Sequence, residues 1–183
     1  MRVYFDTGVF IDYLSKRGAA NEILRSTARR GRNPAEIAAD AERLFETVAK
    51  DHTGATSCLT YYEVEEALYR LLTQSAKGVS RADTFSIPAA RSIATQVQIF
   101  VELFNITVLD LTAGTVRLQL QQLDLQTRGI RAADSLHAAS AIAFDADYLV
   151  STDEALLQMN GRLANGSGNR IRCLDSDSAL QYL

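Results

Sequence analysis

The sequence predicts an α/β protein: a three-layer α/β/α sandwich around a mainly parallel central sheet, formed by residues 1–183 as a single domain. Short apolar or β-branched runs alternate with longer segments whose apolar residues recur at helical spacing. Strands separated by helices favour parallel pairing with helices on both faces of the sheet. A hydrophobic fraction of 47% in 183 residues is enough to fill one core of ordinary size.

The first third of the chain contains one expected strand and three expected helices. Arg2–Phe5 is a short, mostly apolar run that suits a buried strand, and the apolar residues of Val9–Leu14 indicate the start of a helix. Asn21–Arg30 and Pro34–Lys50 are two further helical segments, separated by a break that contains glycine. Pro34 fits the first turn of its helix because the N–H that proline lacks has no intrahelical partner there.

The middle of the chain predicts two strands and two helices. Gly54–Leu59 is expected to be a second strand or an extended approach to a helix, and a helix begins at Thr60. Ser75–Pro88 is expected to be a loop with helical fragments. Ala89–Phe104 follows as a long helix, and Ile106–Leu111 is a strand rich in β-branched residues.

The last third of the chain again alternates helices and strands. Thr112–Arg128 is helical and ends at Gly129, a residue type that suits a helix C-terminus. Ala132–Phe144 is an alanine-rich helix that can pack closely on its neighbours. The remaining elements are the strands Tyr148–Ser151 and Ile171–Leu174, a short helix at Asp153–Met159, and a closing helix or tail at Ser176–Leu183.

Bulk composition narrows the class of protein. A net charge of −3 and a pI of about 5.4 give no overall attraction to nucleic acid, although local patches matter more than the sum. Cys58 and Cys173 lack zinc-like spacing and are expected to be buried, reduced thiols of a cytoplasmic protein. Asp6 and Asp12 interrupt the N-terminal apolar run, so no signal peptide is expected. No uncharged run is long enough to cross a bilayer, so no membrane association is expected.

Acidic residues at four expected strand-to-helix junctions are the most informative feature of the chain. They are Asp6, Glu63, Asp134 and Asp153. In a parallel sheet the working site lies outside the carboxyl ends of the strands. Carboxylates gathered there raise each other's pKa, and a hard divalent cation relieves the repulsion. Because oxygen ligands suit Mg²⁺ or Mn²⁺, the chain is predicted to be a metal-dependent enzyme.

Each of these carboxylates also has a purely structural explanation. Thr60, with Glu63 three residues later, forms a capping-box pattern. Asp153 fits the N-cap of the helix after it, Asp134 fits the first turn of its helix, and Asp6 fits a turn. The prediction of chemistry therefore depends on the four side chains converging in space.

Four segments carry these acids in recognisable motifs: an opening strand and turn, a serine–threonine–glutamate spacing, an aspartate that starts an alanine-rich helix, and a strand that ends in a hydroxyl residue and an acid. The segments are Tyr4–Asp12, Ser57–Glu63, Ala133–Ala141 and Tyr148–Asp153. In this order, and over nearly the whole chain, they resemble PIN-domain proteins, most closely the VapC-like toxin ribonucleases of prokaryotic toxin–antitoxin pairs. One departure is Gly8, which stands where many members carry Asn or Ser.

The resemblance implies a PIN-like fold and an endoribonuclease that hydrolyses RNA phosphodiester bonds with Mg²⁺ or Mn²⁺ as cofactor. The catalytic metal ligands would be Asp6, Glu63, Asp134 and Asp153. Thr7 and Ser151 would orient carboxylates or a metal-bound water through their hydroxyls. The resemblance also implies a toxin role, a cognate antitoxin partner and a homodimer. An amphipathic helix such as Ala89–Phe104 could supply the dimer interface. Additional segments at 18–35 and 75–90 make the chain longer than the compact toxins.

An RNA substrate also needs positive charge, which an acidic pocket supplies only through its metals. The arginines between positions 25 and 32, which include Arg29 and Arg30, form the densest basic cluster and could guide an RNA backbone, although such a run is usually a solvated face. Arg131 is a better-placed candidate because it lies close to Asp134 in sequence. His137, one turn beyond Asp134, could touch substrate, although a packed or hydrogen-bonded histidine is more common.

Two other functions remain open from the sequence. A catalytically inactive PIN-like fold would be a binding module for a protein or RNA partner, and metal binding lost in Asp6→Asn together with nuclease activity would distinguish the enzyme from it. A phosphatase with an aspartyl nucleophile would need a second acid close behind the nucleophile and a lysine near the phosphate. Thr7 and Gly8 follow Asp6, and no lysine follows Lys77, which counts against the phosphatase.

Overall fold

The centre of the protein is a parallel β-sheet. The computed structural model describes residues 1–17, 24 and 28–183, and this part of the chain forms a five-stranded sheet in the order β3-β2-β1-β4-β5. The strands are β1 (Arg2–Phe5), β2 (Thr53–Ser57), β3 (Thr107–Leu109), β4 (Tyr148–Val150) and β5 (Arg172–Leu174). The chain runs from the central strand β1 outward to β3 and then returns to the other side of β1. The direction in which successive strands are added to the sheet therefore reverses between β1 and β4. In α/β proteins, ligands bind at such a switch point.

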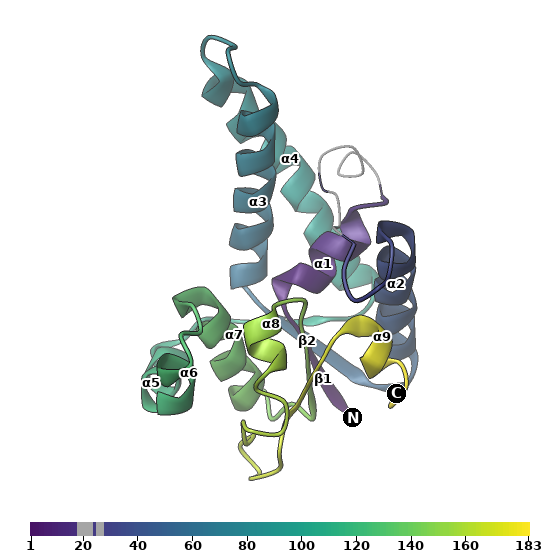
Figure 1. Ribbon diagram of the computed structural model, residues 1–183, viewed down its shortest axis with the longest axis vertical. Coiled ribbons are helices and arrows are strands. Elements are labelled where there is room, and N and C mark those ends of the chain that lie inside the picture. The colour runs from purple at the N-terminus through teal and green to yellow at the C-terminus, as the bar shows by residue number, and fades with distance from the viewer. Residues whose placement is uncertain (18–23, 25–27) are drawn as a thin grey trace.

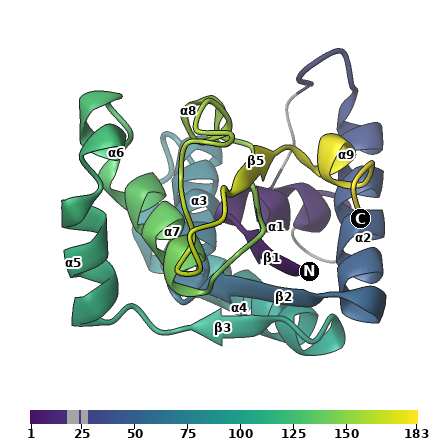
Figure 2. The same cartoon turned by 90° about the horizontal axis from the view of Figure 1, so that it is seen from below.

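Helices cover both faces of the sheet, so the predicted three-layer α/β/α sandwich is confirmed (Figures 1 and 2). The helices of the described residues are α1 (Thr7–Leu14), α2 (Pro34–Asp51), α3 (Leu59–Ser75), α4 (Ala82–Leu103), α5 (Ala113–Gln121), α6 (Leu123–Thr127), α7 (Ala132–Ala143), α8 (Glu154–Leu157) and α9 (Ser176–Ala179). Successive side chains of a strand point to opposite faces. Accordingly Val3 and Phe5 join a core with α1 to α4, whereas Tyr4 joins a second core with α7.

None of the described helices is both long and apolar enough to span a membrane.

Helices α3 and α4 lie side by side and extend away from the sheet as a long pair (Figure 1). The prediction of a loop with helical fragments at Ser75–Pro88 is confirmed only for residues 76–81, because α3 continues to Ser75 and α4 already begins at Ala82. Pro88 lies inside α4, where it removes one backbone N–H from the helical hydrogen bonds. The buried side chains of Ser86 and Ala90 flank Pro88, and the packing of α4 against α3 keeps the helix continuous despite that loss.

Two other predicted helices differ from the structure. Most of Asn21–Arg30 lies outside the described residues, but its end is not helical, since Arg29 and Arg32 exchange backbone hydrogen bonds of 3.2 and 3.0 Å. The two residues between them, Arg30 and Gly31, have φ angles of 52° and 74°, as a tight hairpin turn requires. The predicted helix at Thr112–Arg128 is divided into α5 and α6 at Gln122, whose ψ of 77° is incompatible with a helix.

Phe45 of α2 lies at the centre of the larger core, where we expect a substitution to destabilise the fold most. Its side chain is 1% exposed, and its ring centroid lies 4.8 to 5.5 Å from four other aromatic rings, those of Phe5, Phe10, Tyr13 and Phe104. Phe45→Ala should lower the free energy of unfolding by about 3–5 kcal/mol, measured by urea denaturation, because it leaves a cavity among these rings.

Phe85 provides the matched control, since it is the same residue type but is 71% exposed on α4. Phe85→Ala should change the free energy of unfolding by less than about 0.5 kcal/mol. Equal losses in the two variants would contradict the assignment of the core.

Candidate functional site

Asp6 is held at the carboxyl end of β1 by the neighbouring strand. The register pairs Phe5 with Val150, so the residues that follow, Asp6 and Ser151, lie side by side. Ser151 Oγ donates a hydrogen bond of 2.6 Å to Asp6 Oδ2, and the backbone N–H of Thr7 donates one of 2.8 Å to Oδ1. Both carboxylate oxygens are therefore oriented, and the Asp6 side chain caps α1 at the same time.

Glu63 enters the same region from the first turn and a half of α3. The hydroxyl of Thr7 donates a hydrogen bond to its Oε2 atom. The capping box proposed for Glu63 does not form, because the N-cap of α3 is Cys58 and has no side-chain cap. Thr60 is fully buried instead, and its hydroxyl lies 2.7 Å from that of Thr56. The structural explanation of Glu63 is thus wrong, and its side chain is free to face the site.

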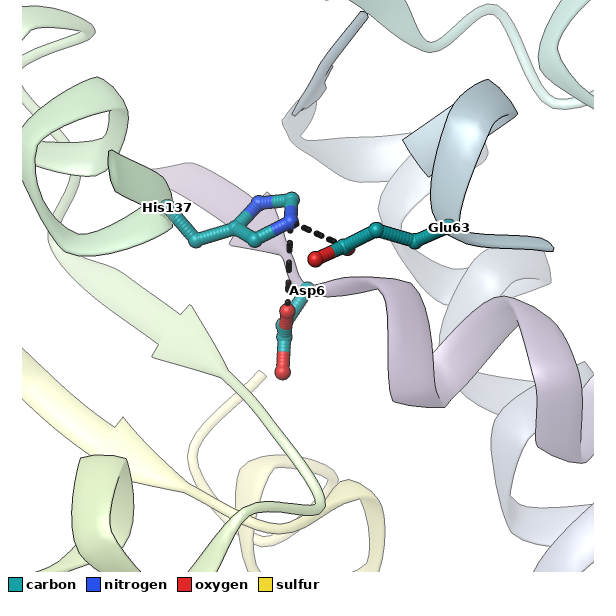
Figure 3. A group of neighbouring side chains, drawn as sticks. All are labelled: Asp6, Glu63 and His137. Carbon is teal, nitrogen blue, oxygen red and sulfur yellow. Dashed lines mark hydrogen bonds and ion pairs between the residues drawn. The ribbon is translucent and has the colours of Figure 1, made fainter. Parts of the chain in front are cut away.

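His137 of α7 joins the two carboxylates (Figure 3). The ring is fully buried, with Nε2 at 2.8 Å from Glu63 Oε2 and 3.6 Å from Asp6 Oδ1, while Nδ1 lies 2.8 Å from the Tyr4 hydroxyl. The expectation of a hydrogen-bonded histidine is confirmed. Its bond to Glu63 could not be expected from the sequence, because no local pattern relates positions 63 and 137.

Asp6, Glu63 and His137 lie close enough for their charges to shift the pKa values of His137 and Glu63. Burial alone would lower the pKa of His137, but the neighbouring carboxylates of Asp6 and Glu63 outweigh it and raise that pKa. Burial likewise would raise the pKa of Glu63, yet the hydrogen bonds and charge of His137, together with Thr7, lower it. The neighbouring carboxylates therefore favour the protonated form of His137.

All four predicted carboxylates line one cleft. Its volume is about 270 Å³, and the residues around it are Asp6, Thr7, Gly8, Ile11, Glu63, Glu66, Ala67, Arg70, Asp134, Thr152 and Asp153. Asp134 comes from the first turn of α7, and Asp153 caps α8 by accepting a bond of 2.7 Å from the Ala155 N–H. Asp153 can therefore cap α8 and still line the cleft, because only its Oδ1 atom accepts hydrogen bonds from the helix.

Asp134 carries the clearest electrostatic sign of this convergence. Burial, followed by the charges of Asp153, Asp6 and Glu63, raises its pKa from an ordinary value of 3.8 to about 6. A carboxyl group shifted by several like charges in a cleft is typical of functional sites. The protein thus maintains an arrangement of carboxylates that costs free energy whenever Asp134 is ionised.

The donor atoms fit a divalent cation. Among the described residues, Asp6, Glu63 and His137 each place one ligand atom within 4.8 Å of the others. Carboxylate oxygens are the donors that Mg²⁺ and Mn²⁺ prefer, and a cation among them would relieve the repulsion that raises the pKa of Asp134. Asp134 and Asp153 line the same cleft and complete an oxygen-rich set.

Gly8 departs from the expected motif for a steric reason. A Cβ atom at position 8 would overlap the side chain of Thr152. Thr152 itself lines the cleft, so its side chain fills the space that a larger residue at position 8 would need.

The arginines predicted to bind substrate lie elsewhere. Arg29 forms a bidentate ion pair with Asp12 and lies 3.3 Å from Asp175, and Arg30 pairs with Glu154 at 2.9 Å. Arg131 is exposed at the N-cap of α7. None of the three lines the acidic cleft. Substrate contact by these arginines stays a prediction, and the charge of Arg29 is already compensated.

A cationic residue that does line the cleft, Arg70, was missed from the sequence. It follows Glu63 by seven residues on α3, which is two helical turns, so both side chains lie on one face of the helix. The seven-residue spacing from Glu63 within one helix was the signal that could have placed Arg70 at the site.

Comparison with known proteins supports the architecture. No family model matches the sequence, and no curated protein matches it. A chain in the crystal structure of VapBC2 from Rickettsia felis, bound to a DNA fragment from their promoter, is similar, with a TM-score of 0.55, 16% sequence identity, and coverage of 94% of this chain and 98% of that chain. The fold is PIN-like. The fold class predicted from the four motifs is thus confirmed.

The crowding around Asp134 predicts a variant that is more stable than the parent. The pKa of about 6 exceeds that of an unfolded aspartate, so the metal-free protein loses stability as pH rises from about 4 through 6. Asp134→Asn removes the charge and should raise the free energy of unfolding by about 1 kcal/mol at pH 7.5, after discounting for solvent around a half-buried group. Near pH 4 the two proteins should be equally stable.

Thermal denaturation in EDTA at both pH values measures this difference. Asp51→Asn, which changes an exposed carboxylate at the end of α2, serves as the control and should shift neither curve. A less stable Asp134→Asn protein at pH 7.5 would contradict the electrostatic account.

Proposed function

We propose that the protein is a divalent-metal-dependent endoribonuclease that hydrolyses RNA phosphodiester bonds. The observation that carries this proposal is the convergence of four carboxylates in one cleft, with a raised pKa at Asp134. The cleft lies at the carboxyl ends of β1 and β4, where the strand order reverses. A PIN-like architecture, and the resemblance of the four motifs to VapC-like ribonucleases, support RNA as the substrate class.

In this proposal the acidic side chains hold Mg²⁺ or Mn²⁺, and the surrounding residues fix their geometry. The ligands would be Asp6, Glu63, Asp134 and Asp153. Such a cation would polarise a phosphoryl oxygen and lower the pKa of a bound water. Ser151 orients Asp6 through its hydroxyl, and Thr7 orients Glu63. Asp134 must lose its proton to bind a cation, so metal affinity should fall below about pH 6.

His137 has a supporting role in the proposed site. Its Nε2 atom contacts Glu63, and the Tyr4 hydroxyl at Nδ1 fixes the orientation of the ring. Because the ring is fully buried, it cannot reach a substrate directly. We assign it the task of orienting Glu63 and compensating charge before the cation binds.

The proposal includes a toxin role and partner proteins. The similar solved chain belongs to VapBC2, a complex that is bound there to promoter DNA. By that likeness this protein would pair with a cognate antitoxin and form a homodimer. Exposed apolar side chains on α4, such as Ile99 at 60% and Leu103 at 65%, offer a surface for a protein partner.

Cleavage of a mixed RNA pool is the direct test of the activity. The purified protein, freed of bound partners, should cut RNA with Mg²⁺ or Mn²⁺ and should be inactive in EDTA. Asp6→Asn and Asp134→Asn should each lower the rate by more than about 100-fold, since each removes a ligand charge. Asp51→Asn should cut at the parental rate, because the residue lies on the exposed end of α2.

The outcome also decides between the nuclease and the inactive binding module. Undiminished cleavage by Asp134→Asn would exclude the assigned site. No cleavage under any metal condition would favour the binding module, in which the cleft binds a cation or partner without hydrolysis.

The oligomeric state is tested by light scattering during size-exclusion chromatography. The proposed homodimer should have twice the chain mass of 20.1 kDa. Ile99 and Leu103 are four residues apart and share a face of α4, so Ile99→Glu should yield the monomer. Lys50→Glu, on the exposed end of α2, is the control. A monomeric parent protein would contradict the dimer.

A further inference from the structure

The negative charge of the acidic cleft would repel the phosphates of a nucleic-acid substrate. Five of the residues around it are acidic, and Arg70 is the one cationic side chain among the described residues that line it. The acids are Asp6, Glu63, Glu66, Asp134 and Asp153. A bound cation would neutralise the inner carboxylates but would leave the phosphates that flank the scissile bond beside Glu66. A strand that crosses this cleft therefore needs a further positive group at its outer end.

Arg70 lies where such a group is needed. It follows Glu63 by two turns on the same face of α3, which places its Cα about 10 Å along the helix axis from that of Glu63. This distance puts the long Arg70 side chain within reach of a phosphate one or two nucleotides from the scissile bond.

The present partner of Arg70 is weakly bound and replaceable. Arg70 Nη2 lies 2.7 Å from Glu66 Oε1, with the side chains 66% and 44% exposed. Exposed ion pairs with this i,i+4 spacing contribute only about 0.3–0.5 kcal/mol. A phosphate can therefore take over the guanidinium, whereas Arg29 is half-buried and shared between Asp12 and Asp175.

We propose that Arg70 binds a backbone phosphate of the substrate strand next to the scissile one, and that Glu66 holds its side chain at the mouth of the cleft until the strand arrives. The guanidinium group suits this task because it can donate two parallel hydrogen bonds to phosphate oxygens. The inference rests on the proposed nuclease function and adds a positioning residue for the substrate, separate from the metal-binding carboxylates.

Arg91 on α4 provides a matched control. Arg91 Nε pairs with Glu65 Oε1 at 2.9 Å, and its side chain is 71% exposed, so its setting resembles that of Arg70. It belongs to a different hollow, beside Tyr62 and Tyr69 between α3 and α4, and does not line the acidic cleft. A general effect of net charge would affect both arginines equally.

The test measures binding rather than cleavage, in protein that carries Asp134→Asn. Fluorescence anisotropy of a short labelled single-stranded RNA in Mg²⁺ gives the affinity over about 50 to 200 mM salt. Adding Arg70→Ala should weaken binding about tenfold at the low-salt end and reduce the slope of log K against log salt by about 0.7, the contribution of one phosphate contact. Arg70→Lys should restore the slope but only part of the affinity.

The other variants separate this inference from the proposed function. Arg91→Ala should leave the slope unchanged, and Glu66→Gln, which releases Arg70, should tighten binding severalfold. Equal effects of Arg70→Ala and Arg91→Ala, an unchanged slope in Arg70→Ala, or no RNA binding at the lowest salt would each overturn the inference. Cleavage by the parent protein is measured separately, so a failure of the nuclease assay is distinguishable from a failure of the Arg70 contact.

Discussion

Crowded negative charge at the carboxyl end of β1 is the constraint on which the site depends. The parallel register brings Asp6 next to Ser151, whose hydroxyl donates a hydrogen bond to the Asp6 carboxylate. The hydroxyl of Thr7 donates one to the carboxylate of Glu63. The buried ring of His137 lies beside both carboxylates, with Nε2 at 2.8 Å from Glu63 Oε2 and 3.6 Å from Asp6 Oδ1. The remaining repulsion raises the pKa of Asp134 to about 6, and a cation bound among the carboxylates would relieve it.

The two faces of the sheet pack against different kinds of side chain. On one face, large aromatic side chains around Phe45 lie at the centre of the larger core. On the other, α7 presents Ala138 and Ala141, both fully buried, so the helix lies close to the strands. This close approach lets His137 reach both the Tyr4 hydroxyl of β1 and the carboxylate of Glu63.

The sequence predicted the parts of the fold that depend on local patterns. Strands β1 and β4 were recognisable as short apolar runs. Asp6 follows β1 directly and Asp153 lies three residues after the last residue of β4, so their convergence follows from the parallel pairing of these strands. The start of α4 at Ala82 was not predictable from local pattern, because proline is unfavourable inside a helix and the helix around Pro88 depends on packing against α3, a tertiary effect. The pairing of Arg29 with Asp175, 146 residues later, has no local signature either.

Asp6 and Ser151 are 145 residues apart along the chain, whereas α3 and α4 are joined by a short turn. Contacts between positions far apart in the chain are slow to form, and during synthesis the N-terminal part of a chain emerges first. During translation the helical pair can therefore assemble while β1 still lacks its neighbour β4. A ribosome-bound chain that ends before Tyr148 has neither Ser151 nor Asp153, so the cleft is incomplete. For the proposed nuclease, the cleft cannot be completed until the segment that carries Ser151 and Asp153 has left the ribosome.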